Sequence, residues 1–418
     1  MVAGARLPKS VGPYRIKEAI GLGGMGIVVS AHHEILGRQV AIKFRFHDDR
    51  PDNERLHERF RHGAALQSEL NHPHVAQVFD FIETDGYQAI VMEYLAGGSV
   101  ESYLKRQGGQ LDVGDVLRVG IRVANALAYS HGEGIIHRDI KPANLMMARP
   151  DRLNTIRLTD YGVAKAPDRS PDITVVGANV GTLWYMSPEQ LSHETVLPAS
   201  DVYSFGATLY ELLTGQIPFA RAETSEVFRR FLDGAPVPPI QGRNPNVPDQ
   251  LAHVIEQTLR LDVETRLGDA AVLSLLLRAV AHLEGYPSIA RLEEEDFPPV
   301  DESIIQAAMN GLPEEVRLPL YDTGMMLAQR PTGLTQSLLS TAGPSPFDTS
   351  VDQMPVARPL INEENFTQLD DEWIRQTDEE VEVVEFSGND DDHDDDDDDD
   401  ADRTIVTSQE DLNMNDGD

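Results

Sequence analysis

Residues 137–144 read His137-Arg138-Asp139-Ile140-Lys141-Pro142-Ala143-Asn144, and this stretch decides the fold. It is dense in polar groups, yet Ile135 and Ile136 precede it and Leu145 and Met146 follow it. A solvated surface loop is rarely flanked by apolar residues on both sides, because isoleucine, leucine and methionine are mostly buried. The pattern therefore predicts polar side chains held against a core, as in an active site.

A second acidic segment, Asp160-Tyr161-Gly162, lies 21 residues beyond Asp139 and again follows apolar residues. Phosphoryl transfer requires a carboxylate that orients the attacking hydroxyl, cations that hold the spreading charge, and oxygen ligands for Mg²⁺. Asp139 suits the first task and Lys141 the second. Asn144 and Asp160 offer hard oxygen ligands for a metal.

Gly21-Leu22-Gly23-Gly24-Met25-Gly26 fits the pattern G-x-G-x-x-G, which alone is weak because dinucleotide-binding folds share it. The residues after it, 27–31, are mostly β-branched and favour a second strand over a helix. A glycine-rich hairpin lets backbone approach phosphates, and Lys43 on the next strand can neutralise phosphate oxygens. Taken alone, the segment is equally well interpreted as a plain hairpin with an exposed lysine.

The first hundred residues read as strands with one helix. Residues 39–44 and 89–93 are short runs rich in β-branched residues, and residues 53–70 have a helical composition. Apolar positions recur at helical spacing over 113–131, 202–213 and 251–259. Strands followed by helices predict two unlike lobes in one α+β unit that closes near Gly285.

Together these motifs resemble the eukaryotic-like (Hanks-type) serine/threonine protein kinases over residues 14–285. The matches are the glycine loop, VAIK at 40–43, HRDIKPAN at 137–144, DYG at 160–162, SPE at 187–189 and Asp201 within DVYSFG. GTLWYMSPEQ at 181–190 is most similar to the bacterial branch. The resemblance implies a bilobal protein kinase-like fold, with a β-rich N-lobe and a helical C-lobe. It also implies ATP with Mg²⁺, or Mn²⁺ in its place, and transfer to Ser or Thr hydroxyls of proteins, this chain included.

The resemblance implies roles for single residues. Asp139 would be the catalytic carboxylate, Lys141 would contact the γ-phosphate and Lys43 the α- and β-phosphates, and Asn144 and Asp160 would bind the metal. The residues expected to contact ATP are Gly21, Leu22, Gly23, Gly24, Met25, Gly26, Val28, Ala41, Lys43, Glu93 and Leu95, beside Met92 as gatekeeper. The residues expected to be structural are Arg138, Asp201 and the pair Glu189 and Arg266.

One position departs from the family pattern. Active members have a glutamate in the helix before the LNHP motif at 70–73, and counting back places it at Gly63. Glu58 and Glu69 lie on other faces at about 100° per residue, and Gln67 shares the face but is uncharged. A glycine inside a helix costs roughly 0.8–1 kcal/mol relative to alanine, so we expect this helix to be poorly ordered or shifted in register. The alternative function is therefore a weakly active or inactive pseudokinase, an ATP-binding signalling scaffold.

Residues 164–186 form the expected activation loop. Thr174 is the first candidate for autophosphorylation and Ser170 the second, while Thr182 is expected to contact the catalytic loop. Arg138 can grip a phosphate on this loop and order it. The alternative is that Thr174 is only a solvated threonine.

The charge is distributed unevenly along the 418 residues, whose formal net charge is −35. Residues 286–418 hold 6 Lys+Arg against 36 Asp+Glu. Phosphate would repel such a segment, so we expect neither nucleic acid nor an anionic membrane as a partner. Residues 390–400 are all Asp except His393. We expect a disordered acidic tail over 331–418, after a short helical or extended piece at 286–330.

Three interpretations of the tail stay open. It is a solvating segment, a docking arm for a basic partner, or a self-phosphorylated site at 404–408 for a phosphothreonine-reading module. The chain has no cysteine, which excludes disulfides, Cys zinc sites and thiol catalysis. Residues 1–10 lack the apolar core of a signal peptide, and the apolar run at 270–281 is too short to span a bilayer. We therefore expect a cytoplasmic protein with no membrane span.

Overall fold

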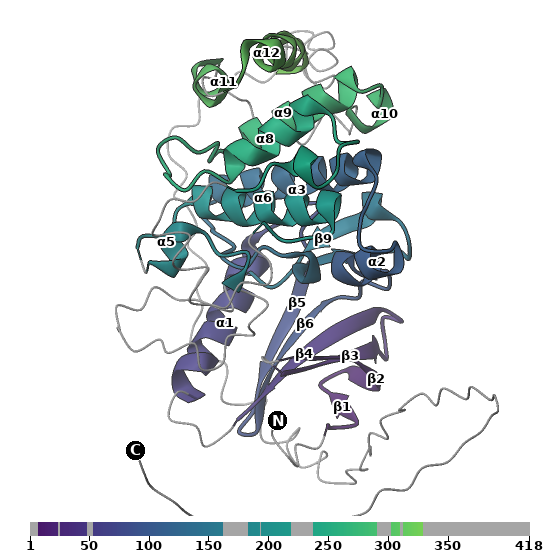
Figure 1. Ribbon diagram of the computed structural model, residues 1–418. Coiled ribbons are helices and arrows are strands. Elements are labelled where there is room, and N and C mark those ends of the chain that lie inside the picture. The colour runs from purple at the N-terminus through teal and green to yellow at the C-terminus, as the bar shows by residue number, and fades with distance from the viewer. Residues whose placement is uncertain are drawn as a thin grey trace, which may run out of the picture.

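The computed structural model describes residues 7–23, 26–47, 53–161, 183–192, 194–218, 237–290, 302–309 and 312–328. They form two lobes, a sheet with one helix beside it and a larger helical lobe (Figure 1). The predicted bilobal α+β architecture is confirmed. The acidic segment 331–418 lies outside the described residues.

The N-lobe sheet is antiparallel and has the strand order β1-β2-β3-β4-β6-β5. Its strands are β1 Ser10–Val11, β2 Tyr14–Gly23, β3 Gly26–His33, β4 Gln39–Phe46, β5 Val78–Glu83 and β6 Tyr87–Glu93. β4 and β6 confirm the two strands predicted at 39–44 and 89–93. Lys43 on β4 pairs with Val28 on β3 and with Ile90 on β6, so it lies on a central strand.

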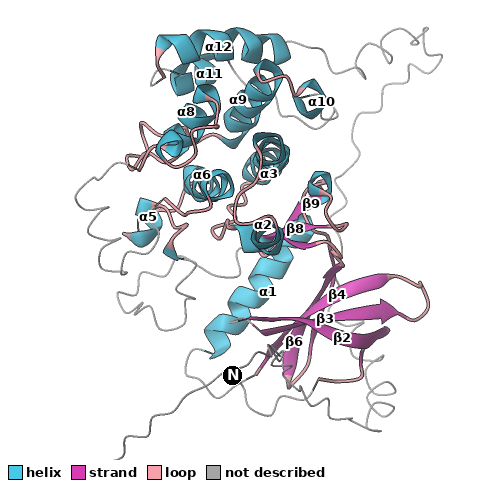
Figure 2. Ribbon diagram, turned by 45° about the vertical axis from the view of Figure 1, so that its right-hand side comes forward, coloured by secondary structure: helices cyan, strands magenta, loops and turns pink. Residues whose placement is uncertain are grey.

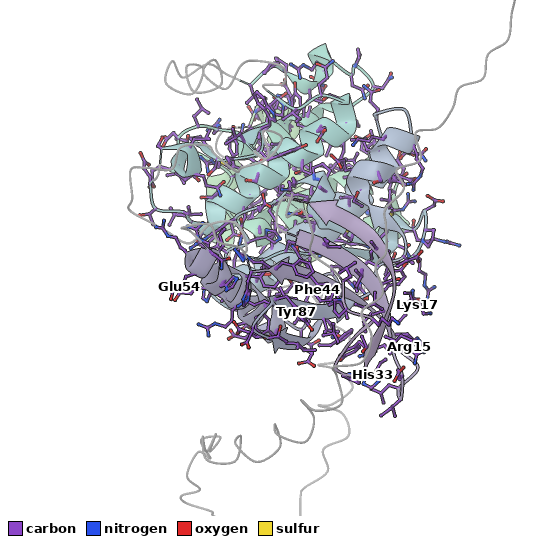
Figure 3. The ribbon with its side chains drawn as sticks, turned by 90° about the horizontal axis from the view of Figure 1, so that it is seen from below. Arg15, Lys17, His33, Phe44, Glu54 and Tyr87 are labelled. Carbon is purple, nitrogen blue, oxygen red and sulfur yellow. The ribbon has the colours of Figure 1, made fainter. Side chains whose placement is uncertain are left out.

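Aromatic side chains pack one face of this sheet. The Phe44 ring is buried, stacks on Phe46 at 5.7 Å between centroids and meets Tyr87 edge-on at 5.2 Å. Seen from below, Phe44 and Tyr87 lie over the middle of the sheet, and Arg15 of β2 lies to the right of them (Figure 3). Because successive side chains of a strand point to opposite faces, this packing fixes β4 with Lys43 on the other face.

Helix α1, Asn53–Glu69, packs on β5 and β6 (Figure 2). Its buried residues Phe60, Gly63, Ala64 and Gln67 form one stripe at helical spacing. The helix is continuous through Gly63, so the expectation of a poorly ordered or shifted helix is wrong. Phe60 and Ala64 pack in one cluster with residues of β4 and β6, and such tertiary packing outweighs the intrinsic cost of one glycine.

The helical lobe is built around α3 Val113–Gly132, α6 Pro198–Thr214 and α9 Ala270–Leu283, which pack on one another. Asp112 caps α3 by accepting from Asp115 N at 2.8 Å. The other elements are α2 Val100–Arg106, α5 Pro188–Leu191, α8 Asp249–Thr258, α10 Pro287–Ala290, the 3₁₀ turns η1 Pro142–Asn144, η2 Leu153–Thr155 and η3 Ile240–Gly242, and a sheet of β7 Gly98–Ser99, β8 Leu145–Met147 and β9 Ile156–Leu158. The helices predicted from apolar spacing are confirmed as α3, α6 and α8.

Two further helices follow, α11 Glu302–Met309 and α12 Glu314–Ala328, at the end of the molecule away from the sheet (Figure 1). Both pack on α9, and Ile305 and Leu320 are buried in the core of the helical lobe. Part of the segment 286–330 is thus built into that lobe. Among the described helices, none combines the length and the apolarity needed to cross a bilayer.

Candidate active site

The loop between α3 and η1 gathers three of the candidate residues at one point. The Asp139 side chain accepts from Lys141 Nζ at 2.9 Å and from Asn144 Nδ2 at 3.0 Å, and Asp139 is only 8% exposed. Asn144 Nδ2 also donates to the Asp139 main-chain carbonyl at 2.7 Å. Pro142 begins η1, and its fixed φ suits the first position of a helical turn. This turn brings Asn144 back onto Asp139.

Asp201, in the first turn of α6, holds this loop in place. It accepts from the main-chain N–H groups of His137 at 2.8 Å and Arg138 at 2.7 Å, and it lies 2.9 Å from His131 Nε2. Burial acts to raise the pKa of Asp201, but His131, His137 and the Arg138 N–H outweigh it and hold the pKa below its ordinary value. Arg138 has a φ of 70°, in the left-handed region. The ionised Asp201 carboxylate therefore stabilises a strained loop.

Lys43 and Asp160 form an ion pair between the lobes. Lys43 Nζ donates to Asp160 Oδ1 at 2.8 Å, and the Lys43 side chain is 8% exposed. Burial acts to raise the pKa of Asp160, but Lys43 next to it lowers the pKa below the ordinary value. The partner that the structure gives Lys43 is therefore the acidic segment after β9 and not a carboxylate at position 63 of α1.

Asn144 and Asp160 fit the metal that the chemistry requires. Both Asn144 contacts with Asp139 use Nδ2, which leaves the amide oxygen for a ligand. Asp160 uses Oδ1 for Lys43, so Oδ2 lies outside that ion pair. One amide and one carboxylate oxygen suit Mg²⁺, which keeps several waters and binds through few protein ligands. The described residues contain no group of three His, Cys, Asp or Glu side chains that could hold a metal.

The expected nucleotide-binding residues that the structure describes lie on β2, β3, β4 and β6, except Leu95, which follows β6 and is buried. Val28, Ala41 and Met92 belong to one apolar cluster, and Ala41 pairs with Met92 across the sheet. Gly26 has a φ of 134°, and a Cβ there would overlap the Phe44 carbonyl oxygen, so this position requires glycine. Glu93 accepts from Arg157 Nε at 3.3 Å, which ties the end of β6 to β9.

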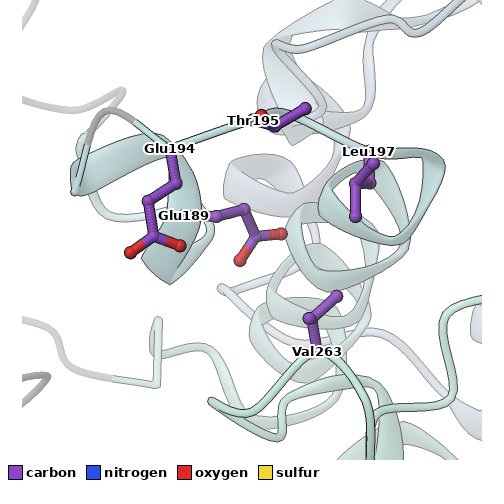
Figure 4. A pocket seen from close by; sticks show the side chains of 5 residues that line it. All are labelled: Glu189, Glu194, Thr195, Leu197 and Val263. Atoms are coloured by element: carbon purple, nitrogen blue, oxygen red, sulfur yellow. The ribbon is translucent and has the colours of Figure 1, made fainter.

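The expected structural pair is present in the helical lobe. Arg266 donates from Nη1 and Nη2 to the two Glu189 oxygens at 2.8 and 3.0 Å. Next to Glu189 on α5, Gln190 donates to the Arg138 carbonyl at 3.0 Å, so this pair is linked to the loop that carries Asp139. A pocket beside α5 is lined by Glu189, Glu194, Thr195, Leu197 and Val263 (Figure 4). Neither Lys43 nor Asp139 lines it, so it is separate from the nucleotide-binding residues.

Several candidates fall outside the described residues. These are Gly24 and Met25 of the glycine loop and Ser170, Thr174 and Thr182 of the activation loop. Gly21, Leu22 and Gly23 lie at the end of β2, where Leu22 pairs with Ile27 and Gly23 with Gly26. This pairing is that of a β-hairpin.

The structure adds two polar contacts that the sequence did not predict. Tyr161, next to Asp160, has its hydroxyl 2.6 Å from Ser130 Oγ on α3. Gln67 on α1 donates from Nε2 to the Ala76 carbonyl at 2.7 Å. The signal available in the sequence for the first contact is the tyrosine itself, because a buried tyrosine hydroxyl usually has a hydrogen-bond partner.

This geometry defines a two-lobed domain with a lysine–aspartate ion pair between its lobes and a buried carboxylate that contacts a lysine and an asparagine. A family model for the protein kinase domain matches residues 14–276, and the chain belongs to this family.

Similar proteins come from several bacteria. The chain is 36% identical over 255 residues to serine/threonine-protein kinase PrkC of Bacillus subtilis, covering 61% of this chain and 38% of PrkC. It is 37% identical over 253 residues to serine/threonine-protein kinase PknA of Mycobacterium tuberculosis, covering 59% of this chain and 56% of PknA. It is 35% identical over 273 residues to serine/threonine-protein kinase pkn3 of Myxococcus xanthus, covering 64% of this chain and 50% of pkn3. The chain thus spans about two fifths to just over half of these relatives.

Among solved structures, the crystal structure of a mutant kinase domain of Mycobacterium tuberculosis PknI superposes with a TM-score of 0.50 at 24% identity. The superposition covers 68% of this chain and all of that domain, at 100%. At this identity the likeness supports the fold alone. The family match and the bacterial relatives confirm the resemblance drawn from the motifs.

Proposed function

We propose that this chain transfers the γ-phosphoryl group of ATP to Ser or Thr hydroxyls of proteins. The observation that carries the proposal is the contact of Asp139 with both Lys141 and Asn144. A pseudokinase that has lost its chemistry has no need to keep a buried carboxylate, a lysine and a metal ligand within hydrogen-bonding distance. The scaffold alternative rests on Gly63, yet Lys43 retains a carboxylate partner in Asp160.

We propose one step of the reaction for each residue. Asp139 accepts a hydrogen bond from the attacking hydroxyl and orients it, as in phosphoryl transfer generally. Lys141, already beside Asp139, neutralises charge that develops on the transferred phosphoryl group. Lys43 binds the phosphates before the chemical step. Asn144 and Asp160 would hold Mg²⁺, which neutralises phosphate charge when bound.

The test is transfer of radiolabelled γ-phosphate from Mg·ATP to the chain itself and to a generic basic protein. Asp139→Asn should lower the rate by about 10²–10⁴-fold. The matched control is Asp151→Asn, since Asp151 is an exposed acid of the same lobe, 68% exposed, paired with Arg106 at the surface. Absence of transfer by the wild type, with ATP binding still measurable by calorimetry, would instead favour the scaffold.

We also propose regulation through the activation loop. Thr174 is the first candidate for autophosphorylation and Ser170 the second. The side chain of Arg138, next to Asp139, would pair with the phosphate and order the loop. Thr182 would contact the catalytic loop. Phosphopeptide mapping of active protein is the test, and an unmodified Thr174 would refute this part of the proposal.

For the acidic segment we propose a solvating role first, since a run of Asp repels itself in any compact form. A docking arm for a basic partner is the second alternative, and a self-phosphorylated site at 404–408 for a phosphothreonine-reading module is the third. Truncation at residue 380 separates them, because unchanged activity and partners are expected for the solvating role alone.

A further inference from the structure

Tyr161 is buried directly beside the metal-ligand candidate Asp160. Its side chain is 0% exposed, its ring lies 4.5 Å from that of His137, and its hydroxyl lies 2.6 Å from Ser130 Oγ. Phosphoryl transfer as described above uses neither Tyr161 nor Ser130. A buried hydroxyl pair of this kind next to a site has either a packing role or a positioning role.

The direction of the hydrogen bond between the two hydroxyls follows from their surroundings. Ser130 donates its one hydroxyl hydrogen to the Ala126 carbonyl at 2.8 Å. Ser130 Oγ is therefore the acceptor for Tyr161, whose hydroxyl donates. Removing Ser130 Oγ leaves the buried Tyr161 hydroxyl donor without an acceptor, which is costly. Removing the Tyr161 hydroxyl leaves only a lone pair of Ser130 Oγ unpaired, and removing both leaves neither group unpaired.

Asp160 itself needs such support, because its backbone is strained. Its φ is 66°, in the left-handed region that L-residues rarely adopt outside glycine, asparagine and aspartate. Strain of this kind persists only where the surrounding structure over-determines the conformation. The residue after Asp160 is Tyr161, so whatever fixes Tyr161 also limits how Asp160 can relax.

A second contact on Tyr161 comes from the other lobe. Gln67 is 5% exposed, lies one turn after Gly63 on α1 and is fixed by its Nε2 bond to the Ala76 carbonyl at 2.7 Å. Its Oε1 then faces the Tyr161 main-chain N–H at 3.5 Å, a long hydrogen bond. Tyr161 is thus held at its hydroxyl by α3 and at its main chain by α1.

We propose that Ser130 and Gln67 are positioning residues that hold Tyr161 from the two lobes and thereby keep Asp160 turned toward Lys43 and the metal. The proposal rests on the proposed function only for the use of Mg²⁺ with a nucleotide. Ser130 and Gln67 would then keep the strained segment of Asp160 and Tyr161 in place, in a protein whose helix α1 has no carboxylate at position 63.

The test is calorimetric binding of ADP to the full chain, once with Mg²⁺ and once with EDTA. Because Asp160 is a metal ligand in this proposal, Ser130→Ala and Tyr161→Phe should each weaken Mg·ADP binding roughly tenfold and leave ADP binding in EDTA unchanged. The double variant should lose no more than Ser130→Ala alone, since the two act through one bond. Gln67→Leu should show the same metal-specific loss.

The matched control is Ser204→Ala on α6. Ser204 is 3% exposed and donates to the Ser200 carbonyl at 3.1 Å, the same type of bond within a helix as Ser130 makes, but without a contact to Tyr161. It should bind Mg·ADP like the wild type. If Ser130→Ala fails to fold, Tyr161→Phe still tests whether the bond between Tyr161 and Ser130 supports Mg·ADP binding, because it leaves the Ser130 bond to Ala126 in place.

Wild-type affinity for Mg·ADP in both Tyr161→Phe and Ser130→Ala would overturn the proposal. So would an equal loss in Ser204→Ala, or a loss that is as large in EDTA as with Mg²⁺, because each would indicate a general packing defect. A wild type that transfers no phosphate would refute the proposed function alone, and the metal-specific loss would then still support the positioning role.

Discussion

The pH dependence of stability gives a sharp prediction for His74, in the loop between α1 and β5. Its Nδ1 lies 2.9 Å from the Ile156 carbonyl, so the neutral ring donates from Nδ1 to the strand β9. Burial lowers the pKa of His74 to about 4; the bond to Ile156 opposes this, while Arg122, His72 and Arg157 add to the lowering. The folded protein therefore resists protonation of this ring.

The sign and size of the effect follow from linkage. A group with a lower pKa in the folded state takes up its proton more readily when the chain unfolds. His74 thus contributes stability that is fully present above its unfolded pKa of 6.5 and is lost as the pH falls toward about 4. With these two values, its contribution decreases by about 2 kcal/mol between pH 7 and pH 5.

Urea unfolding of the full chain at pH 7 and at pH 5 measures this difference. In His74→Asn an amide donor remains near the position of Nδ1 but nothing titrates, so about 2 kcal/mol of the loss should disappear. The control is His253→Asn on α8, a partly exposed ring whose Nδ1 lies near the Asp249 carbonyl of the same helix. Identical pH dependence in the wild type and His74→Asn would refute the reasoning, and so would an equal effect of His253→Asn.

Three more outcomes are expected. Arg266→Ala leaves Glu189 buried without its partner and should lower the free energy of unfolding by about 3–5 kcal/mol at pH 7 in urea; a loss below about 1 kcal/mol would contradict the role of this pair. Truncation after Gly285 removes α10, α11 and α12 and exposes the face of α9 that they cover, at roughly 1.5–3 kcal/mol for each buried apolar side chain; an unchanged thermal midpoint would contradict their place in the core. Lys43→Met removes the cation that lowers the pKa of Asp160, so that pKa should rise, and calorimetry should show weaker ADP binding even in EDTA; wild-type affinity would exclude a phosphate contact of Lys43.

The part of the site that could be predicted is the part encoded locally. Asp139, Lys141 and Asn144 lie within six positions of one another, so a single turn after Pro142 suffices to bring them together. The position of Asp160 depends on the whole fold, yet its motif and its spacing from Asp139 were enough to place it in the same group. Sequence patterns are strongest where few residues between two groups leave little conformational freedom.

What could not be predicted depends on contacts between distant segments. A serine within a helix such as α3 carries no signal of its own, and Tyr161, its partner, lies 31 residues further on. The intrinsic cost of Gly63 was correctly recognised, but the packing of Phe60 and Ala64 that outweighs it is invisible in the sequence of α1 alone. The helix α12 was predicted only as part of a short helical or extended piece over 286–330, and the sequence gives no clear helix there because Pro319 lies inside it.

The features that could not be predicted all depend on contacts between distant segments. Such contacts also explain how Lys43 is paired although α1 has no glutamate at position 63. A charged pair between α1 and Lys43 would orient the lysine and the helix at the same time. Here the two tasks are separate: apolar packing of Phe60 fixes the helix, and Asp160 pairs with Lys43. The side chain that pairs with Lys43 is then the same one that is proposed to bind the metal. The bonds of Tyr161 to Ser130 on α3 and to Gln67 on α1 therefore bear on metal-dependent nucleotide binding through Asp160.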